Sequence, residues 1–401
     1  MTELTVAAVL ATLRTRLAPL AESEAIHLAA GINRVLATDV VSTVDLPAFD
    51  SAAMDGYAIR AEDGTGPVTL KVVGHALAGH AYAGRVERGQ AVRTMTGAVL
   101  PAGADAVVIS EDTEATNGDV RVLRAAHAGQ NVRRRGEHVR AGEAVLLAGR
   151  RLRSHDIGLA ASVGADTLVV TRRLRVAILS TGDELVDAPA PLGASAAYDA
   201  NRPLLAALVT RAGADLIDLG ISSDDDADFT ARLEQAARAR ADVLVTTGGA
   251  AQGDADVVRK HGETEFLPMN FRPGRGLLVG TVARAGHSMA LLGLPGNAVA
   301  AYVMYQLVVR PLLGWMAGAG EEASLTVQLP MAVDTRGKPG RVEWRRARFV
   351  QRYGGLALEP LKDHGSAMLR TLSEADALIA VPPAGVQAGE PIDSMPLAAL
   401  D

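Results

Sequence analysis

The stretch RVAILSTGDEL, residues 175–185, joins a short apolar run to a polar loop that contains glycine. An apolar run of this length, ended by turn residues, is typical of a buried strand. Similar runs occur at DLIDLG (215–220), DVLVTTGG (242–249) and SMALLGLPGN (288–297), with helically spaced residues between them. Strands that alternate with helices favour right-handed crossovers and a parallel sheet covered on both faces. We therefore expect a three-layer α/β domain over residues 173–317.

The segments outside this stretch have a different texture. Residues 46–136 carry short β-like runs such as VTLKVV and DAVVIS between glycine-rich turns, which predicts an inserted, mostly β domain. Residues 20–45 together with 137–172 are expected to form its stalk. Residues 1–19 have the apolar spacing of a surface helix, which we expect to pack on the α/β domain. Alternating apolar residues predict a C-terminal β-barrel over 325–401, so the fold class is multi-domain α/β.

Composition excludes several classes of protein. The chain has 401 residues, enough for two to four domains, and a net charge of -6 that disfavours an extended nucleic-acid surface. No stretch reaches the roughly 18 apolar residues that span a bilayer, and the first residues lack the pattern of a signal peptide. Cysteine is absent, which excludes disulfides, thiolate nucleophiles and cysteine-bound metals. We expect a cytoplasmic protein that contacts neither nucleic acid nor membrane.

Three loops at the ends of predicted strands carry residues that suggest chemistry. They contribute Asp183 and Glu184, then Gly248, Gly249, Asp254 and Asp256, then Gly296 and Asn297. The carboxyl ends of parallel strands meet at one edge, where glycines let the backbone approach an anion. The acidic residues would repel that anion unless Mg²⁺ lay between them. The alternative is that Asp183 and Asp254 are ordinary helix N-caps and the glycines only turn the chain.

A second set of motifs has no pattern that core packing requires. DLPAFDSAAMDGYAIRAED (45–63) leads this set, with VRTMTGAVLPAGADAVV (92–108) and GQNVRRRGEHVRAGE (129–143). Together with STGDEL, TTGG, PGRG and GLPGN, they resemble the molybdopterin molybdenumtransferase family, MoeA, which also occurs as the E domain of gephyrin. The resemblance covers nearly the whole chain and its motifs keep the family's order.

The resemblance implies that adenylylated molybdopterin and molybdate bind in a cleft at a homodimer interface. Mg²⁺-dependent cleavage would release AMP as molybdenum enters the dithiolene. By motif match, the catalytic positions are Asp55, Thr96, Glu184 and Asp256. The metal ligands would be Glu184, Asp256 and Asp224, with Asp225 the weaker match to the last of these. Further partners would be the molybdopterin adenylyltransferase and molybdoenzymes.

Elementary chemistry assigns roles beside that resemblance. Molybdate is a tetrahedral dianion, so a site that holds it against a pyrophosphate needs cations and hydrogen-bond donors. The substrate-binding candidates are Gly248, Gly249, Arg272, Arg275, Gly296, Asn297, Arg341 and Ser366, with Thr96 as a further donor. Replacing an oxo ligand by a thiolate requires a proton, which Asp55 or Glu184 would deliver in the acid form.

Several positions depart from the family pattern. Arg272-Pro273-Gly274-Arg275-Gly276 stands where Lys-Pro-Gly-Lys-Pro is usual, and Ala250-Ala251-Gln252 replaces Val-Ser-Val. Ala298 replaces a proline and Ser51 an asparagine. These changes leave two hypotheses: an active molybdenum-inserting enzyme, or an altered paralog that binds or delivers the pterin. A gephyrin-like scaffold is disfavoured because the long linker and extra domain are missing.

Other charged residues receive plain interpretations. Residues Arg133 to Arg135 are assigned to a solvated turn, because exposed arginine runs are common. Arg345, Arg346 and Arg348 lie on a predicted strand and are interpreted as charges on its exposed edge. The histidines show no ligand spacing and receive no catalytic role.

Overall fold

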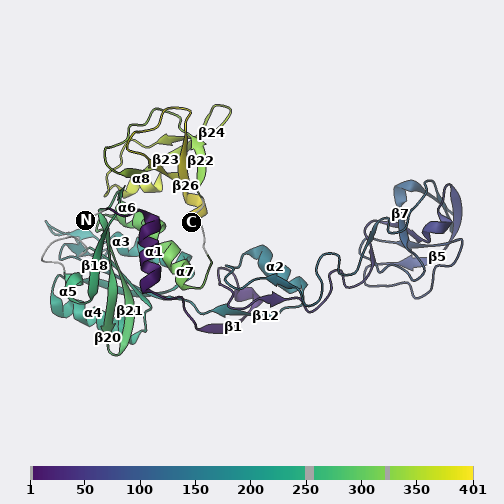
Figure 1. The fold of residues 1–401 in the computed structure, drawn as a ribbon, viewed down its shortest axis with the longest axis horizontal. Helices are drawn as coiled ribbons and strands as arrows, with labels where there is room; N and C mark the ends of the chain where they lie inside the picture. Colours follow the sequence, from purple (N-terminus) through teal and green to yellow (C-terminus); the bar gives the residue numbers. More distant parts are fainter. Residues whose placement is uncertain (1–2, 249–256, 321–325, 401) are drawn as a thin grey trace.

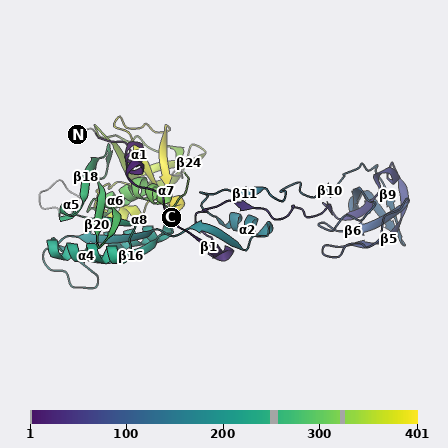
Figure 2. The same cartoon turned by 60° about the horizontal axis from the view of Figure 1, so that its bottom comes forward.

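The computed structural model describes residues 3–248, 257–320 and 326–400. The molecule is elongated (Figures 1 and 2). The α/β domain (residues 175–316) and the C-terminal domain (residues 326–400) lie together at one end. A narrow stalk (residues 23–41 and 144–171) leads from them to a separate distal lobe (residues 51–133) at the other end.

The α/β domain is built on a six-stranded sheet within the described residues. In spatial order its strands are β16 (Asp215–Ser222), β13 (Arg175–Thr181), β17 (Val243–Thr247), β21 (His287–Leu294), β20 (Gly276–Arg284) and β18 (Glu263–Pro268). The first four run parallel, and they are the strands that the apolar runs predict. The last two are antiparallel additions. The two-residue turn Ala285-Gly286, with φ of 48° and 73°, reverses the chain between β20 and β21.

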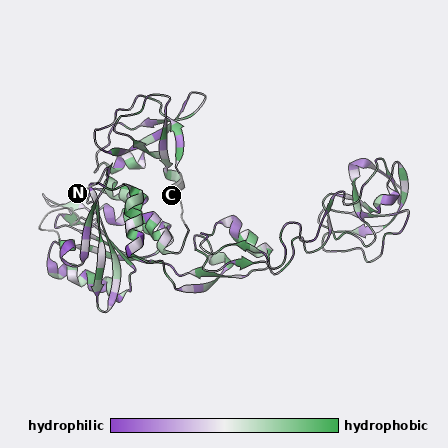
Figure 3. Cartoon of the chain, viewed as in Figure 1, coloured by the Kyte–Doolittle hydropathy of each residue, from purple (hydrophilic) through white to green (hydrophobic). Residues whose placement is uncertain are grey.

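Helices cover both faces of this sheet because successive strand residues point to opposite sides. On one face Val176 and Ile178 of β13 pack against α1 (Val6–Arg16), α3 (Asn201–Arg211) and the α6–α7 helix. Helix α1, largely hydrophobic in Figure 3, contributes Val9 and Leu13 to this core. On the other face Ala177 and Leu179 meet α4 (Asp226–Arg238) and α5 (Val257–Lys260).

One continuous helical run lies at the centre of this core. It comprises α6 (Ala298–Met304), a π-helical turn η4 (Tyr305–Val309) and α7 (Arg310–Met316). Among the described residues this run is long and apolar enough to cross a membrane by length and composition, but 83% of it is buried inside the protein. Such burial is typical of the core helix of a globular domain.

The stalk and the distal lobe have cores of their own. The stalk pairs β1 (Ser23–His27) with β12 (Thr167–Thr171) and β2 (Val40–Val41) with β11 (Ala144–Leu146), and adds η1 (Leu28–Ala30) and α2 (Ser154–Ser162). The sheet of the distal lobe has the order β7 (Ala106–Ile109), β4 (Gly56–Ile59), β6 (Gln90–Thr94), β5 (Val68–Ala76), β9 (Asp119–Val122) and β8 (Thr113–Thr116). It carries the short helices η2 (Ala61–Asp63) and η3 (Ser110–Asp112), and β3 (Ser51–Ala52) pairs with β10 (Val132–Arg133) where the stalk enters.

One strand joins the C-terminal domain to the α/β domain. Its sheet has the order β19 (Phe271–Arg272), β23 (Val342–Arg352), β25 (Ala377–Val381), β26 (Pro391–Pro396) and β22 (Val327–Pro330), with β24 (Gly355–Pro360) on β23 and helices α8 (Leu369–Ser373) and α9 (Leu397–Leu400) beside it. An isolated bridge between Met331 and Leu358 links the β22 end back toward β24. Strand β19 comes from the α/β segment, so its parallel pairing with β23 holds the two domains against each other.

Candidate active site

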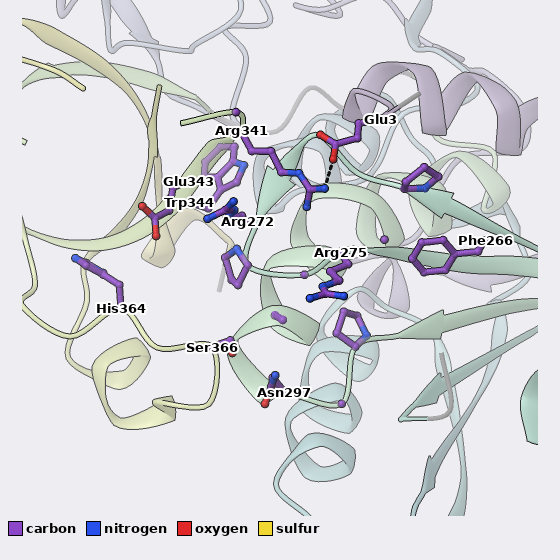
Figure 4. Close-up of a pocket in the computed structure, with 18 of the residues that line it drawn as sticks. Glu3, Phe266, Arg272, Arg275, Asn297, Arg341, Glu343, Trp344, His364 and Ser366 are labelled. Carbon is purple, nitrogen blue, oxygen red and sulfur yellow. Dashed lines mark hydrogen bonds and ion pairs between the residues drawn. The ribbon is translucent and has the colours of Figure 1, made fainter. Parts of the chain in front are cut away.

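A large cavity among the described residues lies where these two domains meet. Its volume is about 1120 Å³. Its walls come from the β18–β20 segment, the loop between β21 and α6, the start of β23 and the loop before α8 (Figure 4). The sequence-predicted substrate residues found there are Gly248, Arg272, Arg275, Gly296, Asn297, Arg341 and Ser366. Of that predicted set only Gly249 is missing from the lining, and it lies outside the described residues.

The ends of the parallel strands are fixed against one another beside this cleft. Ser180 and Thr247 share a buried hydrogen bond of 3.1 Å between their hydroxyls. Gly248 follows at a φ of 80°, where a Cβ atom would lie 2.4 Å from the carbonyl oxygen of Thr181. Only glycine allows this approach without strain. The next loop is anchored by Asn201, whose Nδ2 donates to the Gly296 carbonyl at 2.7 Å.

Three arginines dominate the electrostatics of the cleft. Arg272 lies on β19 and Arg275 precedes β20, and within the described residues neither side chain has a hydrogen-bonding or ionic partner. Arg341 pairs with the carboxylate of Glu3, as the dashed line in Figure 4 marks. Positive groups without counter-charges attract anions, and the planar guanidinium binds an oxyanion through two parallel hydrogen bonds.

A buried arginine holds one wall of the cleft. Arg346 of β23 is fully buried, and its guanidinium donates to the carbonyls of Asp363 at 2.9 Å, Gly365 at 3.2 Å and His364 at 3.4 Å. The sequence-based interpretation of Arg346 as an exposed edge charge is therefore wrong. Strand β23 was predicted correctly, but it lies between β25 and β24 instead of at an edge, so its alternate residues point inward.

The loop that Arg346 holds carries Ser366 and His364. The Ser366 carbonyl accepts the backbone N–H of Val299 at 3.0 Å, which ties the loop to the start of α6. Burial, followed by the charges of Arg346 and Arg345, lowers the pKa of His364 to about 4. Its Nδ1 is buried without a hydrogen-bond partner in the described chain. A neutral imidazole therefore lines the cleft, a feature for which spacing along the sequence offered no signal.

Glu343 supplies a fixed negative charge on the same side of the cleft as His364 (Figure 4). Burial alone would raise the pKa of Glu343, but hydrogen bonds from Lys338 at 2.9 Å and from Arg345 hold that pKa below its usual value. The carboxylate is thus ionised and already paired. Trp344 beside it gives the cleft a flat apolar surface, which suits a planar ring.

An acidic edge lies at the ends of β13 and β16, and β13 pairs with β17, the strand that is followed by the cleft residue Gly248. The Asp183 carboxylate accepts the backbone N–H of Asp224 at 3.0 Å, and Glu184 is exposed beside it. Burial raises the pKa of Asp224, and the charges of Asp183 and Glu184 raise it further. Asp225 caps α4 by accepting from the N–H groups of Ala227 and Asp228, so its carboxylate is already used. Asp183 caps none of the described helices.

This edge has the chemistry of a site for a hard divalent cation without being a complete one. Carboxylates that raise one another's pKa are relieved by a cation between them. No three potential ligands among the described residues are close enough to enclose an ion. Mg²⁺ commonly uses only one or two carboxylates together with substrate phosphates and water, so Asp224 and Glu184 fit that donor set. Asp254 and Asp256 lie outside the described residues.

Asp55 precedes β4 and Thr96 follows β6, so both lie on the distal lobe, which Figures 1 and 2 show at the opposite end of the molecule from the α/β and C-terminal domains that line the cleft. The Asp55 Oδ1 accepts the backbone N–H of Thr96 at 2.7 Å and its hydroxyl at 2.8 Å. These two bonds lower the pKa of Asp55. The free chain therefore presents Asp55 as an ionised carboxylate, whereas the role expected from its sequence motif requires a proton donor.

The turn at residues 133–135 lies where the stalk enters the distal lobe. Arg134 pairs with Asp50 at 2.7 Å, and Arg135 pairs with Asp45 at 2.6 Å. Both arginine side chains are more than half exposed. They are tethers between chain segments on the surface, in agreement with the interpretation as a solvated turn.

Three family descriptions cover this chain in succession. Residues 4–164 match the MoeA N-terminal region (domain I and II), residues 177–315 a probable molybdopterin binding domain, and residues 328–397 the MoeA C-terminal region (domain IV). The second match contains the parallel strands, and the third contains the loop that carries Ser366.

Characterised relatives span nearly the same length. A molybdopterin molybdenumtransferase of Haemophilus influenzae is 32% identical over 390 residues, which cover 94% of each chain. One from a Nostoc species is 34% identical over 90% of this chain and 85% of its own. The crystal structure of the molybdopterin biosynthesis moeA protein from Pyrococcus horikoshii OT3 superposes with a TM-score of 0.85 at 27% identity, and covers 98% of this chain and 99% of its own. The chain therefore belongs to the molybdopterin molybdenumtransferase (MoeA) family, whose members are transferases of molybdenum cofactor biosynthesis.

Proposed function

We propose that this protein inserts molybdenum from molybdate into adenylylated molybdopterin and releases AMP. The observation that carries this proposal is the interdomain cleft, where Arg272, Arg275 and Arg341 line one cavity. Two anionic reactants repel each other in water, so a catalyst must first neutralise them in one place. The cavity of about 1120 Å³ is large enough for a nucleotide-sized ligand together with a small oxyanion.

The lining residues have different roles in binding the reactants. Arg272, Arg275 and Arg341 bind oxyanion charge, and the Ser366 hydroxyl can donate one further hydrogen bond. The glycines Gly248 and Gly296 leave the backbone open to close approach by a phosphate. Trp344 supports the planar pterin through its ring face. Arg346, which touches none of these ligands, holds the loop that presents Ser366.

Mg²⁺ is assigned to the acidic edge. Its proposed ligands are Glu184 and Asp224, with Asp256 as a further one. When bound, the ion would spread the charge that develops as the pyrophosphate is cleaved. The raised pKa of Asp224 supports this assignment, because a carboxyl crowded by two like charges gains most from a cation. Asp225 is the weaker candidate, since it already caps α4.

The active unit in this proposal is a homodimer. Asp55 and Thr96 lie at the opposite end of the chain from the cleft, so they reach a cleft only from a second copy. Cyclic two-fold dimers are the commonest homo-oligomers, and they reuse one contact twice. Asp55 is ionised in the free chain, so it would accept a hydrogen bond or a proton from the bound reactants. The pocket formed in the dimer would then raise the pKa of Asp55.

AMP release tests the proposal directly. Purified protein, adenylylated molybdopterin, molybdate and Mg²⁺ should yield AMP, and omission of molybdate should suppress molybdenum insertion. Arg341→Gln should lower turnover at limiting molybdate, whereas Arg238→Gln, an exposed arginine on α4, should not. Absence of AMP from the complete mixture would remove the proposal.

Complementation separates this function from that of a pterin-delivering paralog. A strain that lacks molybdenumtransferase activity should be rescued by the wild-type gene and not by Asp55→Ala. Equal rescue by both would instead assign the chain to binding or delivery, with the molybdopterin adenylyltransferase and molybdoenzymes as its exchange partners. The cytoplasm, where these partners and reduced pterins occur, is the proposed location.

A further inference from the structure

A carboxylate from the N-terminal segment lies in the cleft. Glu3 lines the cavity, and its Oε1 contacts an Nη atom of Arg341. Figure 4 shows Arg341 reaching down from the rim with the Glu3 carboxylate beside its guanidinium. Both side chains are partly buried, with exposed fractions of 34% for Glu3 and 25% for Arg341. This pair is therefore part of the cleft wall.

The backbone next to Glu3 is held in place. The N–H of Leu4 donates to the Pro268 carbonyl at 2.8 Å, and the Leu4 carbonyl accepts from the Asn270 N–H at 3.0 Å. These bonds form a short parallel bridge between Leu4 and Met269, directly before β19. The Glu3 backbone is thus anchored beside the cleft, while rotation of its side chain alone can break the contact with Arg341.

Arg341 differs from the two other arginines of the cleft because it already has an ionic partner. Arg272 and Arg275 have no ionic partner in the described chain, whereas Arg341 already holds a carboxylate. A carboxylate presents two oxygens to a guanidinium much as a tetrahedral oxyanion does. Glu3 therefore occupies Arg341 in the way that an oxyanion substrate would.

We infer that Glu3 is an affinity-determining residue, a built-in competitor whose carboxylate must leave Arg341 before the oxyanion binds there. The inference rests on the proposed function, since it takes molybdate as the competing ligand. A dianion that bound with Glu3 still in place would meet a like charge in a partly buried site, where repulsion is poorly screened. When the dianion replaces Glu3, Arg341 still has an anionic partner. The repulsion between Glu3 and the dianion is then relieved.

Direct binding measurements test the competition. Molybdate affinity would be measured by titration calorimetry, without nucleotide, for the wild type and Glu3→Gln. The glutamine keeps the size of the side chain and removes its charge. We expect Glu3→Gln to bind molybdate roughly two- to fivefold more tightly, the range that a partly screened ion pair supports. Glu234→Gln, an exposed glutamate on α4 that also pairs with an arginine, serves as the matched control and should bind like the wild type.

A double-mutant cycle locates the effect at Arg341. In the Arg341→Gln background, Glu3→Gln should raise molybdate affinity less than it does in the wild-type background, because the competition has lost its site and only the repulsion by the carboxylate is removed. Unchanged or weaker binding by Glu3→Gln alone would overturn the inference and leave the proposed function standing. Failure of the wild type and both variants to bind molybdate at all would instead remove the proposed function together with the inference.

Discussion

At the scale of single residues, the least expected feature is a buried charge behind the cleft. Arg346 is fully buried and is held by backbone carbonyls and the hydroxyl of Thr371, not by a carboxylate. Such a guanidinium keeps much of its positive potential, and the loop that carries His364 and Ser366 is bound to it. The cleft is therefore electropositive both at its surface and from behind.

Removing the Arg346 guanidinium should destabilise the C-terminal domain. Arg346→Met leaves three carbonyls without their donor, which we expect to cost roughly 2–4 kcal/mol of unfolding free energy. Urea denaturation followed by tryptophan fluorescence would measure it. Arg348→Met on the same strand is the control, since that side chain is half exposed and its loss should cost less than about 0.5 kcal/mol. Equal effects of the two substitutions would contradict the proposed role of Arg346.

His364 should make stability depend on pH in a defined window. Its folded pKa of about 4 lies below the ordinary value of 6.5, so between these values the unfolded chain binds a proton that the folded chain does not. Stability should then fall as pH drops from 6.5 toward 4, by up to about 1.4 kcal/mol per pH unit. Urea unfolding of His364→Gln should show a shallower dependence. Substituting the exposed His75 should leave the dependence unchanged, and an unchanged slope in His364→Gln would refute the assignment.

At the scale of elements, the site depends on how tightly strand ends approach one another. Strands β13 and β17 run side by side up to Thr181 and Gly248, and a side chain at Gly248 would meet the Thr181 carbonyl. The turn between β20 and β21 also uses a glycine with positive φ, Gly286, but there the space beyond the Cα is open. Substitutions at these two glycines therefore distinguish the unfolding free energy lost to backbone strain from that lost to a steric clash.

Gly248→Ala should therefore cost more than Gly286→Ala. At Gly286 the alanine brings only the strain of φ near 73°, about 1 kcal/mol. At Gly248 it adds a contact 2.4 Å from Thr181 O, which must push β13 and β17 apart and should raise the total to roughly 3 kcal/mol. Unfolding free energies would measure both, and molybdate affinity should fall in Gly248→Ala alone. Equal losses would mean that the strand ends can separate freely.

At the scale of the whole molecule, the chain is too extended to complete its own site. The cleft lies at one end, and Asp55 with Thr96 lies at the other, beyond the stalk (Figure 1). A rigid stalk is then part of the active site in the proposed dimer, because its length and direction decide which residues of the second copy reach the cleft. Ion pairs such as Arg172 with Asp242, at 2.8 Å, fasten its base to the α/β domain.

Mixed dimers test this arrangement. Asp55→Asn and Glu184→Gln should each be inactive alone. If the proposed site combines residues of two subunits, random mixing makes half of the dimers mixed, and each mixed dimer carries one intact site of two, so about a quarter of the wild-type activity should return. The unselected mixture of co-expressed dimers would be assayed for AMP release, and mixed dimers isolated through two different tags should show about half of the wild-type activity. No recovery in mixed dimers that size-exclusion chromatography shows to be assembled would place both residues in the same subunit's site.

The sequence alone determined the elements whose signal is local. Apolar runs followed by polar loops predicted the four parallel strands, and the loops at their ends predicted the lining residues Gly248, Gly296 and Asn297. The lining residues Arg272, Arg275 and Ser366 were predicted from other motifs and from the need for cations and hydrogen-bond donors. A strand end and a glycine turn are encoded within a few neighbouring residues, so they can be predicted without knowledge of the fold.

Only the tertiary structure decided what depends on contacts between distant segments. The pairing of Glu3 with Arg341 joins residues 338 positions apart, and the burial of Arg346 follows from the strands that flank β23. The antiparallel edge likewise depends on which strand each segment pairs with, β20 with β21 and β18 with β20. Side-chain charge and spacing are the same on an edge strand as on a central one. Their effect is set by neighbours that only folding brings together.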